Sequence, residues 1–207
     1  MKKICLLLAL IICLVPVLTS CDGILVGLTG GSAGAESVAK EYIDAIYKDF
    51  DKNALFEISA RYNKELLKSK LSEEDFESHT YEGWREAIEM HIKKHRTYAA
   101  DAAEYDVKYK VYSSRTVSKD SDEFGVITGN TVFRETEMED AVEELALVRV
   151  VGEQNYVNSS DEERTVTFYE ELLCLKIDGK WYVYGNVSYD THYAKNDKDK
   201  NMEEWLD

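Results

Sequence analysis

The chain has 207 residues, and its 40 acidic and 25 basic side chains give a net charge of −15. So acidic a chain is a poor ligand for nucleic acid or anionic lipid, because both need a basic surface. Hydrophobic residues make up 44%, which supports a folded core and argues against global disorder, and the length fits one domain. No nucleic-acid partner is therefore expected.

The first 20 residues have the pattern of a removable export segment. Two lysines precede an apolar stretch over 4–17, which is shorter than the roughly 20 residues that a spanning helix needs. The stretch is followed by Leu18-Thr19-Ser20-Cys21, which resembles the lipobox of bacterial lipoproteins. The resemblance implies cleavage before Cys21 and transfer of a two-chain lipid to its sulfur, a stable membrane anchor. Ordinary cleavage nearby, with Cys21 unmodified, is the alternative.

This interpretation divides the chain into four segments. They are a signal peptide (1–20), a lipidated cysteine with a Gly-rich tether (21–35), a folded domain (36–190) and a polar C-terminal tail (191–207). After the signal peptide, 23 basic and 40 acidic residues remain, a net charge of −17. Cys174 is then the one cysteine besides Cys21. It lies in an apolar run and is expected to be a buried structural thiol.

The N-terminal half of the domain has helical spacing. Apolar residues every three or four positions predict a helix over 36–50. Asn53 is expected to cap a second helix through Ile58, and Ser72 before three acids indicates a helix start. A further helix over 81–98 is expected to bury Trp84, Ile88, His95 and one of His91 and Ile92.

The C-terminal half has strand patterns. Alternation over 105–111 predicts a half-buried strand, while 118–140 is interpreted as a loop with room for a short helix. Helices followed by antiparallel strands indicate an α+β fold. Further strands are predicted over 145–151, 164–177 and 181–189, with a turn-rich segment at 155–163 and a tight turn at Asp178-Gly179.

A family resemblance rests on the two ends of the domain. The segment VAKEYIDAI (38–46) resembles the first helix of NTF2-like lipoproteins, and LKIDGKWYV (175–183) is similar to their last hairpin. The resemblance implies an NTF2-like cone, in which N-terminal helices pack on a curved antiparallel sheet with an open mouth. Enzymes, binding proteins and adaptors share that fold, so the fold alone does not indicate a function.

Aromatic and acidic residues on the predicted strands are the candidates for lining a ligand pocket. Tyrosine on a sheet can line a ligand cavity, although it also packs strands. The period of two places Glu170 and Glu171 on opposite faces, so one of them is expected to point into the cone. Burial there would raise its pKa and suit it to base catalysis. The possible lining residues are Tyr105, Tyr109, Phe168, Glu170 and Trp181.

Two patterns resemble metal sites but are incomplete. His91 and His95 have the i, i+4 spacing of zinc ligands, but Ile92 stands where the zincin pattern has Glu. Residues 197–201 match the first ligand positions of a calcium loop, but Met202 stands at the glycine position. No metal or cofactor is therefore expected.

These patterns favour a lipoprotein on the extracytoplasmic face of the cell membrane, acting as a non-catalytic ligand-binding or protein-interaction module of the envelope. The alternative is an anchored enzyme that uses Glu170 or Glu171 on a small polar substrate. A structural role, with a homodimer or an envelope protein bound through the sheet face, is a third expectation. The sequence has no phosphate-binding Gly-rich loop, nucleophile elbow or His-Glu-x-x-His motif.

Overall fold

The computed structural model describes residues 32–78, 81–100, 102, 104–134, 136–157 and 160–186. In this part of the chain, six helical segments precede an antiparallel sheet, with two short helices between its first two strands, which confirms the predicted α+β class. No helix in these ranges is long and apolar enough to span a membrane. The elements are α2 (Ser32–Ile43), the π-helix η2 (Asp44–Lys48), α3 (Lys52–Ile58), α4 (Lys64–Lys70), α5 (Glu73–Ser78), α6 (Tyr81–Ala100), β1 (Glu104–Val117), α7 (Asp122–Thr128), α8 (Glu137–Ala141), β2 (Val142–Val157), β3 (Glu163–Ile177) and β4 (Lys180–Asn186).

The four strands form one antiparallel meander in the order β1-β2-β3-β4. The prediction of a turn-rich segment over 155–163 is wrong for residues 155–157, which belong to β2. Asn155, for example, pairs with Asp106 of β1 and with Thr165 of β3. The end of β2 is half-buried and the facing start of β3 is exposed, so polar residues there are compatible with a strand. The predicted turn at Asp178-Gly179 is confirmed: both residues have positive φ, 50° and 73°, as a type I′ hairpin requires.

The helix starts follow local capping chemistry. Asp51 caps α3, because its carboxylate accepts from the backbone N–H of Asn53 and Ala54 at 2.9 and 3.1 Å, so the expected cap at Asn53 is wrong. The hydroxyl of Ser72 accepts from Asp75 N–H at 3.1 Å, which confirms the helix start there.

The helices differ from the sequence pattern in three other places. Helix α4 was not predicted, and the segment 118–140, interpreted as a loop with room for one short helix, holds α7 and most of α8. Helix α2 begins four residues before the predicted position 36, and Ala35 is already fully buried.

The central part of the sheet, on β2 and β3, is buried on both faces. Because side chains alternate along a strand, Leu172 and Cys174 of β3 face one core with α2 and η2. Leu173 and Leu175 face a second core with α4, α7 and α8. Cys174 is fully buried, as predicted, and its thiol lies 3.8 Å from the Ala35 carbonyl oxygen.

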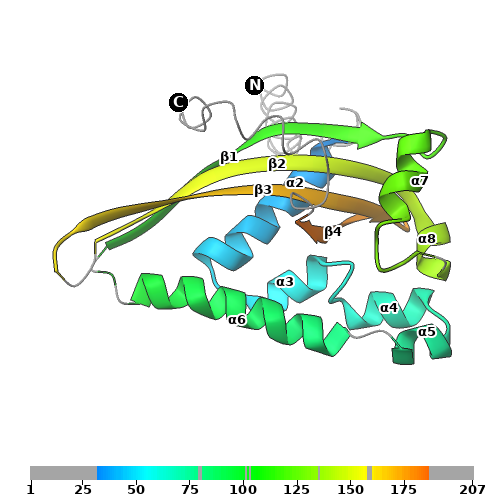
Figure 1. Ribbon diagram of the computed structural model, residues 1–207, viewed down its shortest axis with the longest axis horizontal. Helices are drawn as coiled ribbons and strands as arrows, with labels where there is room; N and C mark the ends of the chain where they lie inside the picture. Colours follow the sequence, from blue (N-terminus) through cyan, green and yellow to red (C-terminus); the bar gives the residue numbers. More distant parts are fainter. Residues whose placement is uncertain are drawn as a thin grey trace, which may run out of the picture.

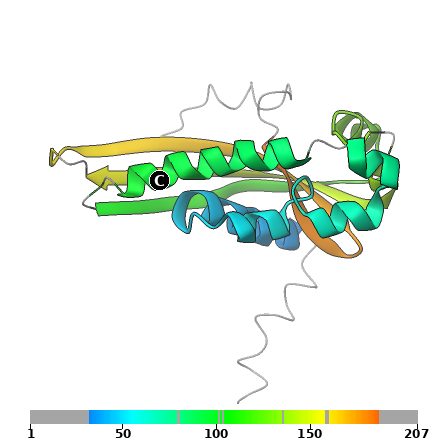
Figure 2. The same cartoon turned by 90° about the horizontal axis from the view of Figure 1, so that it is seen from below.

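The arrangement of layers follows from these two cores. Helices α7 and α8 lie at one end of the sheet, and α3, α4, α5 and α6 form a layer below it (Figure 1). Seen from below, α6 runs along the sheet beside the α2–η2–α3 segment (Figure 2). Of the α6 side chains that the structure describes, only Ile92 and His95 are buried. Helix α6 is therefore lightly held for its length.

Gly152 of β2 tests the close packing of β1 on the central strands. A Cβ at this position would meet the Phe168 ring and would lie 2.7 Å from the Lys108 carbonyl oxygen. We expect Gly152→Ala to lower the free energy of unfolding by about 1–3 kcal/mol, because neither neighbour can move freely.

The matched control is Gly125→Ala in α7, where nothing lies within 4 Å of an added Cβ. This change is expected to leave stability unchanged or raise it by up to about 1 kcal/mol through helix propensity. Urea unfolding measures both variants, and equal effects would contradict the packing account.

Candidate binding cleft

A buried polar cluster joins η2, α6 and the sheet around Tyr47. The Tyr47 ring stacks on Phe168 with centroids 4.2 Å apart and packs edge-on against His95 at 4.6 Å. Its hydroxyl donates to Glu170 Oε1 at 2.5 Å. Tyr105 donates its hydroxyl proton to the Tyr47 carbonyl oxygen, also at 2.5 Å. One tyrosine of η2 therefore ties the helical layer to β1 and β3.

His95 and Gln154 are the buried polar pair of this cluster, with exposures of 7% and 1%. His95 Nδ1 lies 2.9 Å from Gln154 Oε1. With the Gln154 amide in this orientation its oxygen accepts, so Nδ1 carries the proton and Nε2 is left as an acceptor. Neither His95 Nε2 nor the Gln154 amide nitrogen has a hydrogen-bond partner in the described part of the chain. Burial lowers the pKa of His95, so the ring is neutral near pH 7.

The two candidate carboxylates lie on opposite faces of β3. Glu171 is fully buried and pairs with Arg149 Nε at 2.9 Å. Glu170 faces η2, where burial raises its pKa while hydrogen bonds from Tyr47 and Asn186 act in the opposite direction. Both Glu170 oxygens therefore already accept protein hydrogen bonds. This arrangement positions the side chain and gives no free oxygen aimed at a substrate.

The connection from η2 to α3 is irregular. The π-helix widens the end of α2, with Asp49 N–H donating to the Asp44 carbonyl oxygen at 2.7 Å. Phe50 follows with a φ of 54°, a left-handed conformation that costs a bulky residue roughly 1–2 kcal/mol. π-Helical turns and strained residues are concentrated at functional sites. The surface formed by this connection is therefore the candidate functional surface of the chain.

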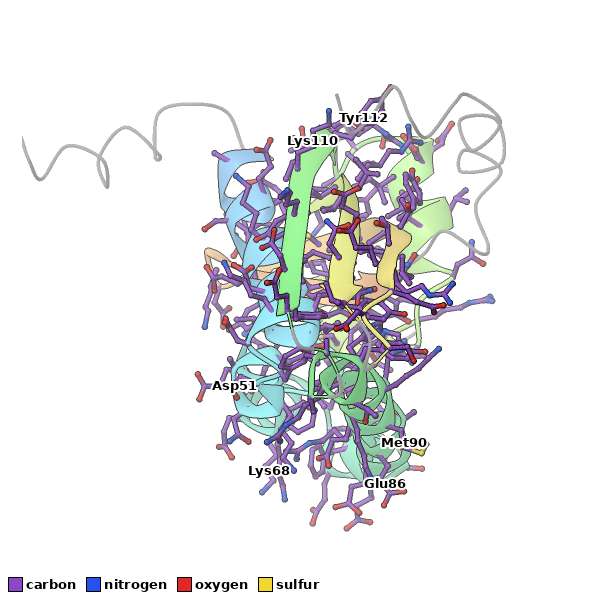
Figure 3. The ribbon with its side chains drawn as sticks, turned by 90° about the vertical axis from the view of Figure 1, so that its left-hand side faces the viewer. Asp51, Lys68, Glu86, Met90, Lys110 and Tyr112 are labelled. Atoms are coloured by element: carbon purple, nitrogen blue, oxygen red, sulfur yellow. The ribbon has the colours of Figure 1, made fainter. Side chains whose placement is uncertain are left out.

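An open cleft of about 780 Å³ lies between this connection and α6. Its volume falls within the range of small-molecule sites. Figure 3 labels Asp51, Glu86 and Met90 on the two sides of this helical layer, away from the sheet end that carries Lys110. The lining residues are Asp49, Phe50, Asp51, Lys52 and Asn53 from the connection, and Glu86, Glu89, Met90, Ile92, Lys93 and Arg96 from α6.

The cleft offers an apolar wall and charges of both signs. Lys52 pairs with Glu89 across it at 3.1 Å, and Asp51 is engaged in capping α3. Among the described residues, Lys93 and Arg96 have no acidic partner within ion-pair distance. Met90, at the rim, is 67% exposed, and exposed methionine suits an adaptable binding surface. A ligand with an apolar part and charged groups would find partners here.

The five predicted lining residues do not line this cleft. Tyr105, Phe168 and Glu170 meet at Tyr47, on the sheet side of the same layer. The other two lie farther along the helix-facing side: Tyr109 donates to the Lys40 carbonyl oxygen at 3.4 Å, and Trp181 packs against Gly34. Tyr105 also borders a smaller hollow of about 390 Å³ at the end of the sheet.

His91 and His95, predicted from their spacing to share one face of a helix, are neighbours on α6. The His91 and His95 rings lie 4.6 Å apart. In the ranges that the structure covers, no three His, Cys, Asp or Glu side chains are grouped to hold a metal ion. The calcium-like segment at 197–201 lies outside the described residues.

Comparison of the chain with protein-family models, with curated proteins and with solved structures finds no match.

The His91 titration tests the contact between the two histidines of α6. The His91 residue is exposed overall, but partial burial of its ring, His95 and Lys94 lower its pKa from 6.5 to about 4. Between these values the unfolded chain binds the extra proton, so this histidine's contribution to stability is full above pH 6.5 and is lost as pH falls to about 4. Wild type should therefore lose more stability than His91→Gln between pH 7 and pH 4.5.

Urea unfolding of both proteins at the two pH values measures the difference, and an NMR titration of the His91 ring gives its midpoint. Parallel losses of stability, together with a midpoint near 6.5, would contradict the account.

Proposed function

We propose that this chain is a lipid-anchored lipoprotein of the bacterial cell envelope that acts on the extracytoplasmic face as a non-catalytic binding module. The cleft between α6 and the η2–α3 connection is its binding surface. The observation that carries the proposal is the connection that follows the π-helix: it holds the strained residue Phe50 and lines an open cleft. The anchor is supported by Lys2, Lys3, the apolar stretch and the lipobox at Cys21.

The cleft favours an amphiphilic ligand. Phe50, Ile92 and Met90 offer apolar contact. Lys93 and Arg96, one turn apart, suit a carboxylate or phosphate group. Asp49 and Glu86 offer acceptors for a positive group. A small zwitterionic molecule or a short peptide segment combines these features.

The finer fold proposal is an NTF2-like cone. Its support is the single core that α2 and η2 share with all four strands, together with the final hairpin at Asp178-Gly179. In such a cone, Tyr105, Phe168 and Glu170 would form the floor beneath the helical layer, next to the cleft wall at Ile92.

The anchored-enzyme alternative rests on one observation, the raised pKa of Glu170. A general base needs a partner within hydrogen-bond reach of a substrate. The partners of Glu170 are Tyr47 and Asn186, which hold both of its oxygens. The binding-module proposal therefore stands ahead of the enzyme.

The anchor is tested by Cys21→Ala, with Cys13→Ala in the apolar stretch as the matched control. Without the acceptor sulfur the chain has no two-chain lipid, so most of the Cys21→Ala protein should leave the membrane fraction. The control should stay in the membrane. Fractionation and immunoblotting measure this, and membrane retention of both variants would count against the lipid anchor.

The cleft is tested by Met90→Asp, with Val126→Asp on α7 as the control. Met90 and Val126 are similarly exposed, at 67% and 64%, so neither change should unfold the chain. Native mass spectrometry of protein purified without refolding should find a bound molecule on wild type and on the control. Met90→Asp should lose at least about tenfold in occupancy, because it places a charge on the apolar wall. Equal occupancy in all three would place the ligand elsewhere.

A further inference from the structure

Strand β1 lies at the edge of the sheet. It pairs with β2 on one side, and no other strand that the structure describes lies on its second side. Its 14 residues leave a long row of backbone N–H and C=O groups on that side, the geometry on which another strand can add. In Figure 1, β1 begins toward the left of the sheet, close to the C-terminal end of α6.

The first half of β1 carries a self-complementary charge pattern. Residues 104–110 read Glu-Tyr-Asp-Val-Lys-Tyr-Lys. The two acids and two lysines are exposed on one face, while the tyrosines and Val107 are half-buried on the other. When two copies of the segment are aligned antiparallel about Val107, each acidic residue lies opposite a lysine and each tyrosine lies opposite a tyrosine. Charge complementarity therefore points to a second copy of this chain as the strand that fits the edge.

We propose that two copies pair antiparallel through the free edge of β1, with Val107 opposite Val107 on the two-fold axis. Glu104 then lies opposite Lys110, and Asp106 opposite Lys108, each pair twice by symmetry. On the other face Tyr105 lies opposite Tyr109. The two sheets become one, with the helices of both copies on the same side. This contact uses the sheet edge, whereas the sequence alone predicts a dimer through the sheet face.

Other registers are less complementary. A two-fold axis at Asp106 keeps Glu104 opposite Lys108 but sets Asp106 opposite itself, which is destabilising. An axis at Lys108 keeps Asp106 opposite Lys110 but sets Lys108 opposite itself. A shift of the axis by half a residue places inward-facing side chains opposite outward-facing ones. Within one chain the ion pair between these charges is weak: Lys108 Nζ lies 3.9 Å from Asp106 Oδ2, and the two side chains are 70% and 62% exposed. Pairing with a second copy gives each of them a direct cross-strand partner.

A cysteine at position 107 tests the register on the full chain in intact cells. Directly opposed residues of antiparallel strands lie about 4.5–5.5 Å apart at Cα, within disulfide reach. Val107→Cys should therefore form a covalent dimer on oxidation, read as a doubled mass on a non-reducing gel. Tyr112→Cys, five residues along the same strand, is the matched control and should stay monomeric. Monomeric Val107→Cys, or equal cross-linking of both, would overturn the proposal.

Charge reversal tests the pairing chemistry in the Val107→Cys background. Lys108→Glu with Lys110→Glu makes all four pairs like-charged, so the dimer yield should fall about tenfold or more. Glu104→Lys with Asp106→Lys should do the same. Co-expression of the two double variants restores every opposite-charge pair, so the dimer should return as a mixed species. Equal dimer yields in the charge variants and in Val107→Cys alone would refute the pairing. A mixture of the two double variants that fails to cross-link would refute it too.

Discussion

The structure depends on the burial of both faces of β2 and β3. Their central residues are apolar on both sides, so neither face can be left in water. The face with Leu172 and Cys174 requires α2 and η2, and the face with Leu173 and Leu175 requires α4, α7 and α8. One sheet therefore organises two cores, and each helix is held by the apolar side chains that it brings to one of them.

The polar groups of the first core are concentrated at one end, next to the cleft. There the apolar contacts give way to Tyr47, His95, Gln154 and Glu170, which are joined by hydrogen bonds and ring contacts. An unpaired buried donor or acceptor costs roughly 1–3 kcal/mol, and His95 and Gln154 each have one unpaired nitrogen. The layer formed by α6 is thus less firmly bound than the rest, and the strained Phe50 lies at its border. A cleft between weakly bound elements suits a binding module, because such elements can adapt to a ligand.

Much of the fold could be predicted because its elements have strong periods. The apolar spacing over 36–50 and 81–98 and the alternation over 105–111 correspond to α2 with η2, α6 and the first half of β1. The extended tip of β2 and β3 could not be predicted, because strand ends such as Asn155, which is only half-buried, carry the same polar residues as turns. The helix cap at Asp51 was missed because Asn53 is as good a capping residue by type, and only the backbone geometry distinguishes the two.

The cleft could not be predicted, since its two walls come from segments about 37 residues apart, as Lys52 and Glu89 show. Its shape depends on a π-helix and on the left-handed backbone of Phe50, and no periodicity marks either feature. The sequence did indicate Tyr105, Phe168 and Glu170, but Tyr47, which joins them, looked like one more residue of an amphipathic stripe.

The most direct test of the cleft as the binding surface is hydrogen–deuterium exchange on purified protein, before and after any bound molecule is removed by partial unfolding and dialysis. The account predicts faster exchange after removal in α6 and in residues 49–53, with β2 and β3 unchanged. Exchange that is the same in both samples, or that changes only in the sheet, would contradict it.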